Sequence, residues 1–336
     1  MIQTILNNKA MKTKFFKLIV LSMLVTAFSS CVNDKAGDLS TVKWNEFTTV
    51  GLNDRIYAVS CDSTKNVWVG TDNGAFKFDG QSWTNYRSFG NNSQVKAIAT
   101  DGDNNIWFGT NGAGVAKYKA GSWTYYRNDP TFPNTISSNF IYSIAIDSYG
   151  IKWIGTDNGV CKFDGQNWTV YKVENGLAEN HVFSIAIDKQ GNKWFGTNGG
   201  VSKFNDTNWV NYVYSKDNSN GIVGNGVLGI AIDNQGNKWF ATFGGLSEFD
   251  GTTWTNFKTQ TDWLKSGSPV LSAAIDAKGH KWFGSNGMGI SEFDGVKWTT
   301  YTMANSSIIS PVNAIAKDTY GNLWLGTSSG LLELTK

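Results

Sequence analysis

The chain has 336 residues, with 37 Gly, 15 Trp and only 4 Pro, a balance that predicts many short strands joined by glycine turns and argues against disorder. The formal net charge is +2, but four lysines among residues 1–30 leave 25 basic against 27 acidic residues beyond them. Because that remainder contains no block of Lys and Arg, we expect no nucleic-acid partner.

The first 30 residues have the pattern of a targeting segment. A basic stretch from Met11 precedes an apolar run over residues 18–28, and two serines separate this run from Cys31. The run is too short to span a bilayer. The segment resembles a bacterial lipoprotein signal, which implies a start at Met11, removal of residues 1–30, lipidation of Cys31 and a tether over residues 31–41. An ordinary secretory signal with an unrelated cysteine is the alternative.

Beyond the tether, the chain repeats the pattern Asp-x-x-Gly-Asn-x-Trp. The aspartates of the seven copies are Asp62, Asp101, Asp147, Asp188, Asp233, Asp276 and Asp318. A tryptophan follows each of them by six residues, at Trp68, Trp107, Trp153, Trp194, Trp239, Trp282 and Trp324. Successive copies lie 39 to 46 residues apart, which is the length of one four-stranded propeller blade.

Each copy divides into four expected strands, illustrated by the fourth copy. A β-branched residue six positions before the Asp opens strand a, "VFSIAI", whose small residues would let a neighbouring sheet approach. In the turn that follows, the Asp is expected to bond the backbone two residues on, and the Gly supplies a positive φ. Strand b is "KWFGT", strand c is "VSKFND" and strand d is "NWVNY".

The last copy has no strand d, because the chain ends on "LLELTK". Instead, Trp44 and Phe47 stand before the first copy with the spacing of a strand d. We therefore expect residues 42–48 to pair with the last strand c and to close a ring. The predicted fold is all-β, one seven-bladed β-propeller over residues 42–336 with four antiparallel strands per blade. An open solenoid would need polar caps at both ends.

The stretch "SIAIDKQGNKWFGTNGGVSKFND" at residues 184–206 resembles the two-component regulator propeller repeat, and the resemblance covers all seven copies. In that family such propellers commonly form the periplasmic sensor part of membrane histidine kinases and recognise oligosaccharides. This sequence carries no kinase or DNA-binding module, so we expect any signalling to pass through a separate protein. The resemblance and the leader together imply the cell envelope, on the periplasmic side or at the outer membrane, with membrane contact through the lipid anchor only.

The two faces of the expected disc differ in their connections. The a–b and c–d turns are uniform, whereas the d–a connections contain 8 to 14 residues and have unrelated sequences. Variable loops on a rigid scaffold are where binding usually lies. Our ligand-binding candidates on this variable face immediately precede strand a, lie in longer b–c turns or lie in a long d–a loop: Arg55, Gln94, Phe140, His181, Asn111, Asn286 and Trp263. Drift in unconstrained loops, or for Trp263 a loop anchor, is the alternative.

Catalysis and metal binding have weaker support. His280 stands where Asn occurs in other copies, so we expect a turn substitution on the uniform face. A similarity to streptogramin lyases, which are seven-bladed propellers that use a His/Glu pair with magnesium, makes His280 and Glu292 the alternative, although we expect no second acid or histidine beside them. "DGDNN" at residues 101–105 has the opening spacing of a calcium loop without its later Glu, so an ordinary turn is expected.

These observations predict a non-catalytic, lipid-anchored envelope propeller that needs no cofactor or metal. Its expected partner is an oligosaccharide or an envelope protein, bound on the variable face. A lyase-like enzyme and an assembly component of an envelope complex are the alternatives.

Overall fold

The computed structural model describes residues 43–47, 55–86, 89, 94–216, 220–258, 264, 267–308 and 311–335. All of these belong to the compact unit Val42–Lys336. The leader, Cys31, the tether and Trp263 lie outside the described residues, so the predictions on them stay predictions. Within the described ranges, no helix combines the length and the hydropathy needed to cross a bilayer.

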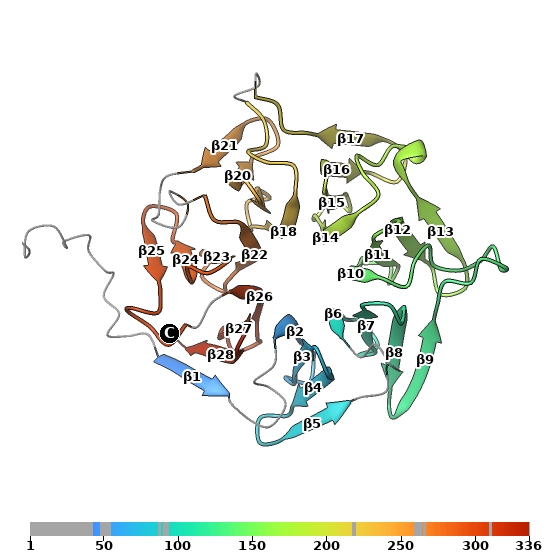
Figure 1. The fold of residues 1–336 in the computed structure, drawn as a ribbon, viewed down its shortest axis with the longest axis horizontal. Helices are drawn as coiled ribbons and strands as arrows, with labels where there is room; N and C mark the ends of the chain where they lie inside the picture. The colour runs from blue at the N-terminus through green and yellow to red at the C-terminus, as the bar shows by residue number, and fades with distance from the viewer. Residues whose placement is uncertain are drawn as a thin grey trace, which may run out of the picture. The chain divides into compact units, whose positions relative to one another are not determined.

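The described residues form seven four-stranded antiparallel sheets arranged in a ring (Figure 1), so the chain is a seven-bladed β-propeller, as predicted. The innermost strands, a, are β2 (Ile56–Cys61), β6 (Val95–Thr100), β10 (Ile141–Ile146), β14 (Val182–Ile187), β18 (Val227–Ile232), β22 (Val270–Ile275) and β26 (Val312–Lys317). The b strands are β3 (Val67–Thr71), β7 (Ile106–Thr110), β11 (Lys152–Thr156), β15 (Lys193–Thr197), β19 (Lys238–Thr242), β23 (Lys281–Ser285) and β27 (Leu323–Thr327).

The outer half of each blade consists of strands c and d. The c strands are β4 (Gly74–Phe78), β8 (Val115–Lys119), β12 (Gly159–Phe163), β16 (Gly200–Phe204), β20 (Gly245–Phe249), β24 (Ile290–Phe293) and β28 (Gly330–Thr335). The d strands are β5 (Trp83–Tyr86), β9 (Ser122–Tyr126), β13 (Trp168–Tyr171), β17 (Trp209–Tyr212), β21 (Trp254–Phe257), β25 (Trp298–Tyr301) and, for the last blade, β1 (Lys43–Phe47). A 3-10 turn, η2 (Val173–Asn175), follows β13.

The predicted ring closure is confirmed by β1, which pairs antiparallel with β28 and places Phe47 opposite Leu331. The ring of Phe47 then packs against two aromatic rings of the first blade, Phe78 at 5.5 Å and Trp83 at 6.0 Å, and against Trp324 of the last blade at 5.1 Å between centroids. Because the same side chain touches the first and the last blade, the closure covers a strand edge and completes the hydrophobic core between these two blades.

The repeated Asp ties its turn to the core through a bond that the sequence analysis missed. In all seven copies the Trp indole Nε1–H donates to Oδ2 of the Asp six residues earlier, at 2.9–3.2 Å. At Asp188, Oδ1 also accepts the backbone N–H groups of Gln190 at 3.1 Å and Asn192 at 2.9 Å. The fixed spacing therefore gives the N–H of each buried indole a hydrogen-bond acceptor.

The hydrophobic core lies between neighbouring blades. Trp194 is 1% exposed and packs with Val227 and Phe240 of the next blade. Gly196, two residues later, faces that blade so closely that a Cβ would lie 2.7 Å from the carbonyl oxygen of Val227, so a side chain there would push the blades apart. The turn glycine is replaced by Lys65 and Asn104 in two copies, and both residues adopt the positive φ that the turn requires, 71° and 60°.

Candidate functional site

The d–a connections and the b–c turns meet on one face of the disc, as the antiparallel blades require. At one such meeting the backbone N–H of Asn111, in the turn after β7, donates to the carbonyl of Gln94 at 3.0 Å. Asn111 also forms an isolated antiparallel bridge with Phe140, which precedes β10. Turns and connections of adjacent blades therefore support one another on the variable face.

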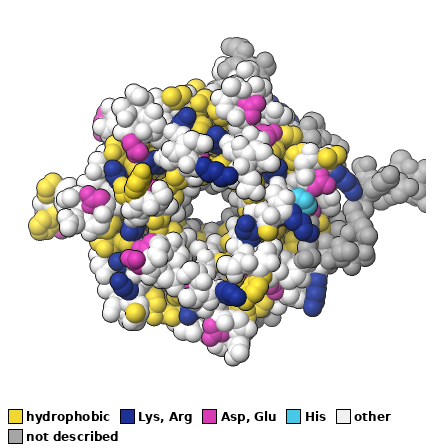
Figure 2. All heavy atoms as spheres, turned by 180° about the vertical axis from the view of Figure 1, so that it is seen from behind, with side chains coloured by type: hydrophobic (Ala, Val, Ile, Leu, Met, Phe, Trp, Pro, Cys, Tyr) yellow, Lys and Arg dark blue, Asp and Glu magenta, His cyan; other side chains and the backbone are white. Residues whose placement is uncertain are grey.

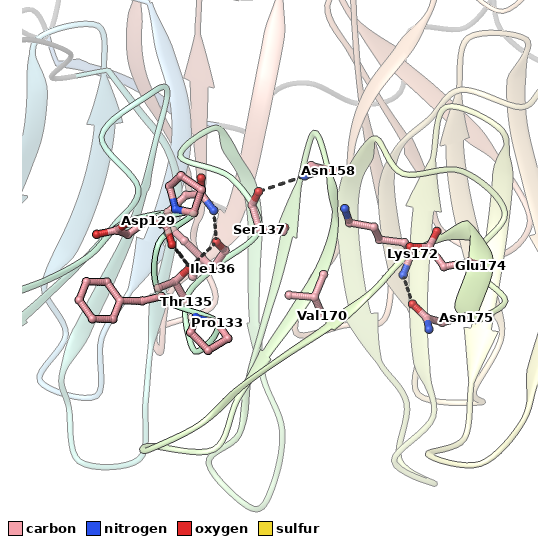
Figure 3. A pocket seen from close by; sticks show the side chains of 13 residues that line it. Asp129, Pro133, Thr135, Ile136, Ser137, Asn158, Val170, Lys172, Glu174 and Asn175 are labelled. Carbon is pink, nitrogen blue, oxygen red and sulfur yellow. Dashed lines mark hydrogen bonds between the residues drawn. The ribbon is translucent and has the colours of Figure 1, made fainter.

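A groove lies between two connections on this face, and we call it the loop groove (Figure 3). Its walls come from residues 127–140, between β9 and β10, and residues 172–181, between β13 and β14. Its volume is about 490 Å³. The residues that line it are Asn128, Asp129, Pro130, Phe132, Pro133, Thr135, Ile136, Ser137, Asn158, Val170, Lys172, Glu174 and Asn175.

The first wall is held in place by local hydrogen bonds and one buried anchor. Oδ1 of Asp129 accepts the backbone N–H of Thr131 at 2.9 Å and its hydroxyl at 2.6 Å. These bonds lower the pKa of Asp129, which keeps this carboxyl ionised at neutral pH. Asn128 donates to the carbonyl of Ile136 at 2.6 Å, and the side chain of Ile136 is buried in the core between two blades. The loop is therefore a shaped element of the propeller.

The second wall is built around η2. The side-chain oxygen of Asn175 accepts the backbone N–H of Lys172 at 2.8 Å, and Gly176 ends the turn with φ 116°. Leu177 then enters the core between the third and fourth blades. Asn158 closes the inner end of the groove, where its amide donates to the carbonyl of Ser137 at 3.1 Å. Figure 3 shows the two walls facing each other across Val170.

The groove combines an exposed aromatic ring with polar groups of every kind. Phe132 is 64% exposed. Carboxylates, an ammonium group and amides surround the hollow, from Asp129, Glu174, Lys172 and three asparagines. Such a set can both donate hydrogen bonds to hydroxyl groups and accept them, while the ring offers an apolar stacking surface. The chemistry suits a polyhydroxylated ligand that also has an apolar face.

The a strands line a central channel. Four of the sequence-predicted residues immediately precede an a strand, at the mouth of this channel on the variable face: Arg55, Gln94, Phe140 and His181. Figure 2 shows the other end of this channel, on the uniform face. A cavity of about 210 Å³ lies in this channel, and every a strand contributes to its lining. The fourth residue of each a strand forms an apolar ring there, from Val59, Ile98, Ile144, Ile185, Ile230, Ala273 and Ile315.

The structure brings Gln94 and Asn111 together. Gln94 Nε2 donates to the hydroxyl of Tyr57 at 2.9 Å and to Oδ1 of Asp72, while its Oε1 accepts the Asn111 amide at 2.7 Å. The guanidinium of Arg55 lies 5.9 Å from the centroid of the Tyr57 ring, at the edge of this network. These polar groups therefore satisfy one another as well as facing solvent.

The other candidates lie apart from that network or at its margin. The ring of His181 lies 4.7 Å from Tyr142 and 4.4 Å from Phe183. Glu179 accepts the backbone N–H of His181 at 3.0 Å, so this carboxylate is directed to the main chain. Phe140 is exposed, and Asn286 lies over the sixth blade, where its N–H donates to the carbonyl of Pro269 at 3.1 Å.

None of these sequence-predicted residues lines the loop groove. Whether they bind a ligand stays a prediction. The length of connection 127–140 was the one signal in the sequence that pointed to the groove.

On the uniform face, His280 lies against two acids. Its Nδ1 is 2.5 Å from Oε1 of Glu292 and 3.7 Å from Oδ2 of Asp276, so the expectation that no second acid accompanies the pair was wrong. All three side chains could reach a common metal ion. The same bond recurs with Asn in the flanking blades, from Asn237 to Glu248 at 3.0 Å and from Asn322 to Glu333 at 3.1 Å. This recurrence favours a turn substitution, as does the engagement of Asp276 by the indole of the Trp six residues later.

Part of the repeat matches a known family model. Residues 51–73, 88–112, 176–199 and 306–329 match the sequence model of the family described as two component regulator propeller. The matched segments lie in the first, second, fourth and seventh copies of the repeat. No curated protein sequence matches this chain significantly.

Solved structures similar to this chain include proteins of different kinds. The extracellular domain assigned to a hybrid two component system of B. thetaiotaomicron is 22% identical, with a TM-score of 0.72 over 84% of this chain. A streptogramin B lyase is 16% identical, with a TM-score of 0.74 over 90% of this chain and 99% of its own. PorZ, a surface component of the type-IX secretion system of Porphyromonas gingivalis, is 18% identical, with a TM-score of 0.68 over 84% of this chain.

At these identities the likeness concerns the fold alone. This chain spans only 40% of the B. thetaiotaomicron domain and 46% of PorZ. A sensor domain, an enzyme and a secretion component thus share one scaffold, so function has to be argued from the site.

Proposed function

We propose that this propeller is a non-catalytic binding module of the cell envelope that recognises an oligosaccharide-like ligand in the loop groove, in the service of sensing. The observation that supports it most is the exposed ring of Phe132 beside the carboxylates and amides of the groove. The similarity to extracellular and surface propellers agrees with an envelope location. The lipid anchor at Cys31 belongs to the proposal through the leader pattern alone.

The physical basis is the combination of stacking with preformed hydrogen-bonding groups. An aromatic ring can cover the apolar face of a sugar, and the groups around it can bond the hydroxyls at its edge. Because buried Ile136 and Leu177 anchor both walls, the groove would lose little conformational freedom on binding. The proposal that no reaction is catalysed rests on the uniform face, where the His280–Glu292 pair repeats an Asn–Glu bond of the flanking blades.

The test measures binding of soluble oligosaccharides and cell-wall fragments to the mature protein by isothermal titration calorimetry. We expect one glycan class to bind, and Phe132→Ala to weaken that binding by about tenfold or more, which corresponds to about 1.4 kcal/mol. Tyr149→Ala is the matched control, because Tyr149 is 88% exposed but lies in an a–b turn on the uniform face.

Binding that both variants leave unchanged would place the ligand elsewhere than in the groove. If no glycan bound at all, the proposed ligand class would be wrong, and an envelope protein partner would become the leading alternative. A magnesium-dependent reaction lost in His280→Ala would instead indicate a lyase-like enzyme.

A further inference from the structure

Lys96 occupies an unusual place in the central channel. It is the second residue of β6, and among the described residues that line the channel cavity it is the only charged one. Its Nζ lies 3.2 Å from the centroid of the Tyr57 ring. Within the described part of the chain, no hydrogen bond and no close ion pair reaches this ammonium group. A half-buried cation is thus held by a ring face alone, although ammonium groups in such places usually have an acceptor.

The charges that act on Lys96 leave a net positive charge at this point of the channel. The guanidinium of Arg55 also lies over the Tyr57 ring, 5.9 Å from its centroid. The single acid that acts on Lys96 is Asp72, whose Oδ1 is engaged by the hydroxyl of Tyr57 and by Gln94. Burial lowers the pKa of Lys96 to about 8, a shift that the charge of Asp72 opposes and that of Arg55 increases. Two cations and one acid thus leave one net positive charge immediately around Lys96, while the acid Asp157 acts on Tyr142 of the neighbouring strand.

An aromatic wall stands on the next two a strands. Tyr142 of β10 and Phe183 of β14 line the cavity, and the ring of His181 packs on both. Further round the ring the corresponding residues are Leu228 and Leu271, which are aliphatic. The cavity therefore has a cation on one side, flat apolar surfaces beside it and an aliphatic ring along the channel. Among the described residues its lining includes no carboxylate, whereas the loop groove has carboxylates and several amides that can bond hydroxyl groups.

The geometry points to a second binding site in this channel mouth, for a small monocarboxylate with a flat apolar body. The carboxylate would accept hydrogen bonds from Nζ of Lys96, and the body would lie against Tyr142 and Phe183. A single net positive charge suits a monoanion, whereas a phosphate dianion usually requires several N–H donors or a bidentate arginine. A cavity of about 210 Å³ limits the ligand to a small molecule. This site is separate from the loop groove and does not depend on the proposed glycan function.

The test uses benzoate and phenylacetate as probes, with benzamide as the uncharged counterpart, titrated into the mature protein by calorimetry. We expect the carboxylates to bind and benzamide to bind about tenfold more weakly or not at all. Lys96→Met should weaken carboxylate binding by about tenfold or more, and Lys96→Arg should retain much of it. Lys117→Met is the control, because Lys117 also lies over a ring, 5.4 Å from Trp107, but outside the channel lining.

The pH dependence gives a second readout that a purely structural lysine would not produce. Carboxylate affinity should fall as the pH rises from about 7 to about 9.5, because the ammonium form of Lys96 is lost through its lowered pKa. Burial raises the pKa of Tyr57 and of Tyr142, so both stay neutral in this range. Among the described residues, the other titratable or charged groups beside these side chains are Arg55, Asp72, His181 and Asp157, the last of which acts on Tyr142.

Equal binding of benzoate and benzamide, no binding of either, or unchanged binding in Lys96→Met would each overturn the proposal. The melting temperature of Lys96→Met, measured alongside, should not fall, since methionine fills the same space without a desolvated charge. Phe132→Ala should leave carboxylate binding unchanged. The proposed channel site and the proposed glycan site can therefore be disproved independently of each other.

Discussion

The two faces of this propeller follow different rules. On the uniform face the seven a–b turns repeat one solution, in which an Asp carboxylate binds the indole of a core Trp at 2.9–3.2 Å. On the variable face the connections differ in length and sequence, and only two of them enclose the loop groove. The difference teaches that the residues repeated in every blade stabilise the fold. A ligand should therefore be sought at the connections that differ between blades.

The largest loss of stability is expected when a repeated tryptophan is removed, and this tests whether the repeated residues stabilise the fold. Trp194→Ala should lower the free energy of unfolding by about 3–5 kcal/mol, because it empties a fully buried site between two blades. Guanidinium unfolding followed by circular dichroism would measure this, with Trp194→Phe as the milder variant. A loss below about 1 kcal/mol would mean that the blades repack around the cavity.

A smaller effect is expected from the carboxylate that holds this indole. Burial alone would raise the pKa of Asp188, but hydrogen bonds from Trp194 and Asn192 outweigh it and lower the pKa below 3.8. A lowered pKa contributes stability that is fully present above the unfolded-state value and is lost as the pH falls through the folded-state value. Asp188→Asn should therefore cost about 1–2 kcal/mol at pH 7.

The same variant makes the pH dependence measurable. The difference in unfolding free energy between wild type and Asp188→Asn should narrow as the pH falls from 7 to about 3, because the wild-type carboxyl then takes up a proton. Urea unfolding at several pH values would follow it. A difference that stayed constant with pH would show that the charge of Asp188 does not contribute.

The smallest effect on stability is expected on the variable face. Phe132→Ala should change the free energy of unfolding by less than about 0.5 kcal/mol, because most of the side chain is exposed. The same variant is expected to lose glycan binding. Loss of stability above about 1 kcal/mol would instead make Phe132 a loop anchor and would weaken the contrast between the two faces.

Most of the fold could be predicted from the sequence, because each blade repeats its core residues at a fixed spacing. The displaced strand was predictable for the same reason, since Trp44 and Phe47 keep the spacing of a strand d. The Asp–Trp bond could have been predicted from the constant spacing of six residues, but the turn geometry alone already explained the Asp.

The candidate site was much less predictable. The loop groove depends on two connections that are separate in sequence and on where Ile136 and Leu177 anchor them. Lys96 escaped notice because it stands inside a strand whose pattern is otherwise apolar and small. Only the ring arrangement places it in a shared channel beside residues of the other six blades.

The closure by β1 and β28 has a consequence for how the molecule is made. Asn45 donates its side-chain amide to Glu333 across 288 residues of chain, so the strand synthesised first must wait for the strand synthesised last. Such a distant contact is slow to form, and until then β28 of the last blade exposes an unpaired strand edge. It also brings the two ends of the ring side by side. A circular permutant that links them and opens at another d–a connection should assemble the same seven blades.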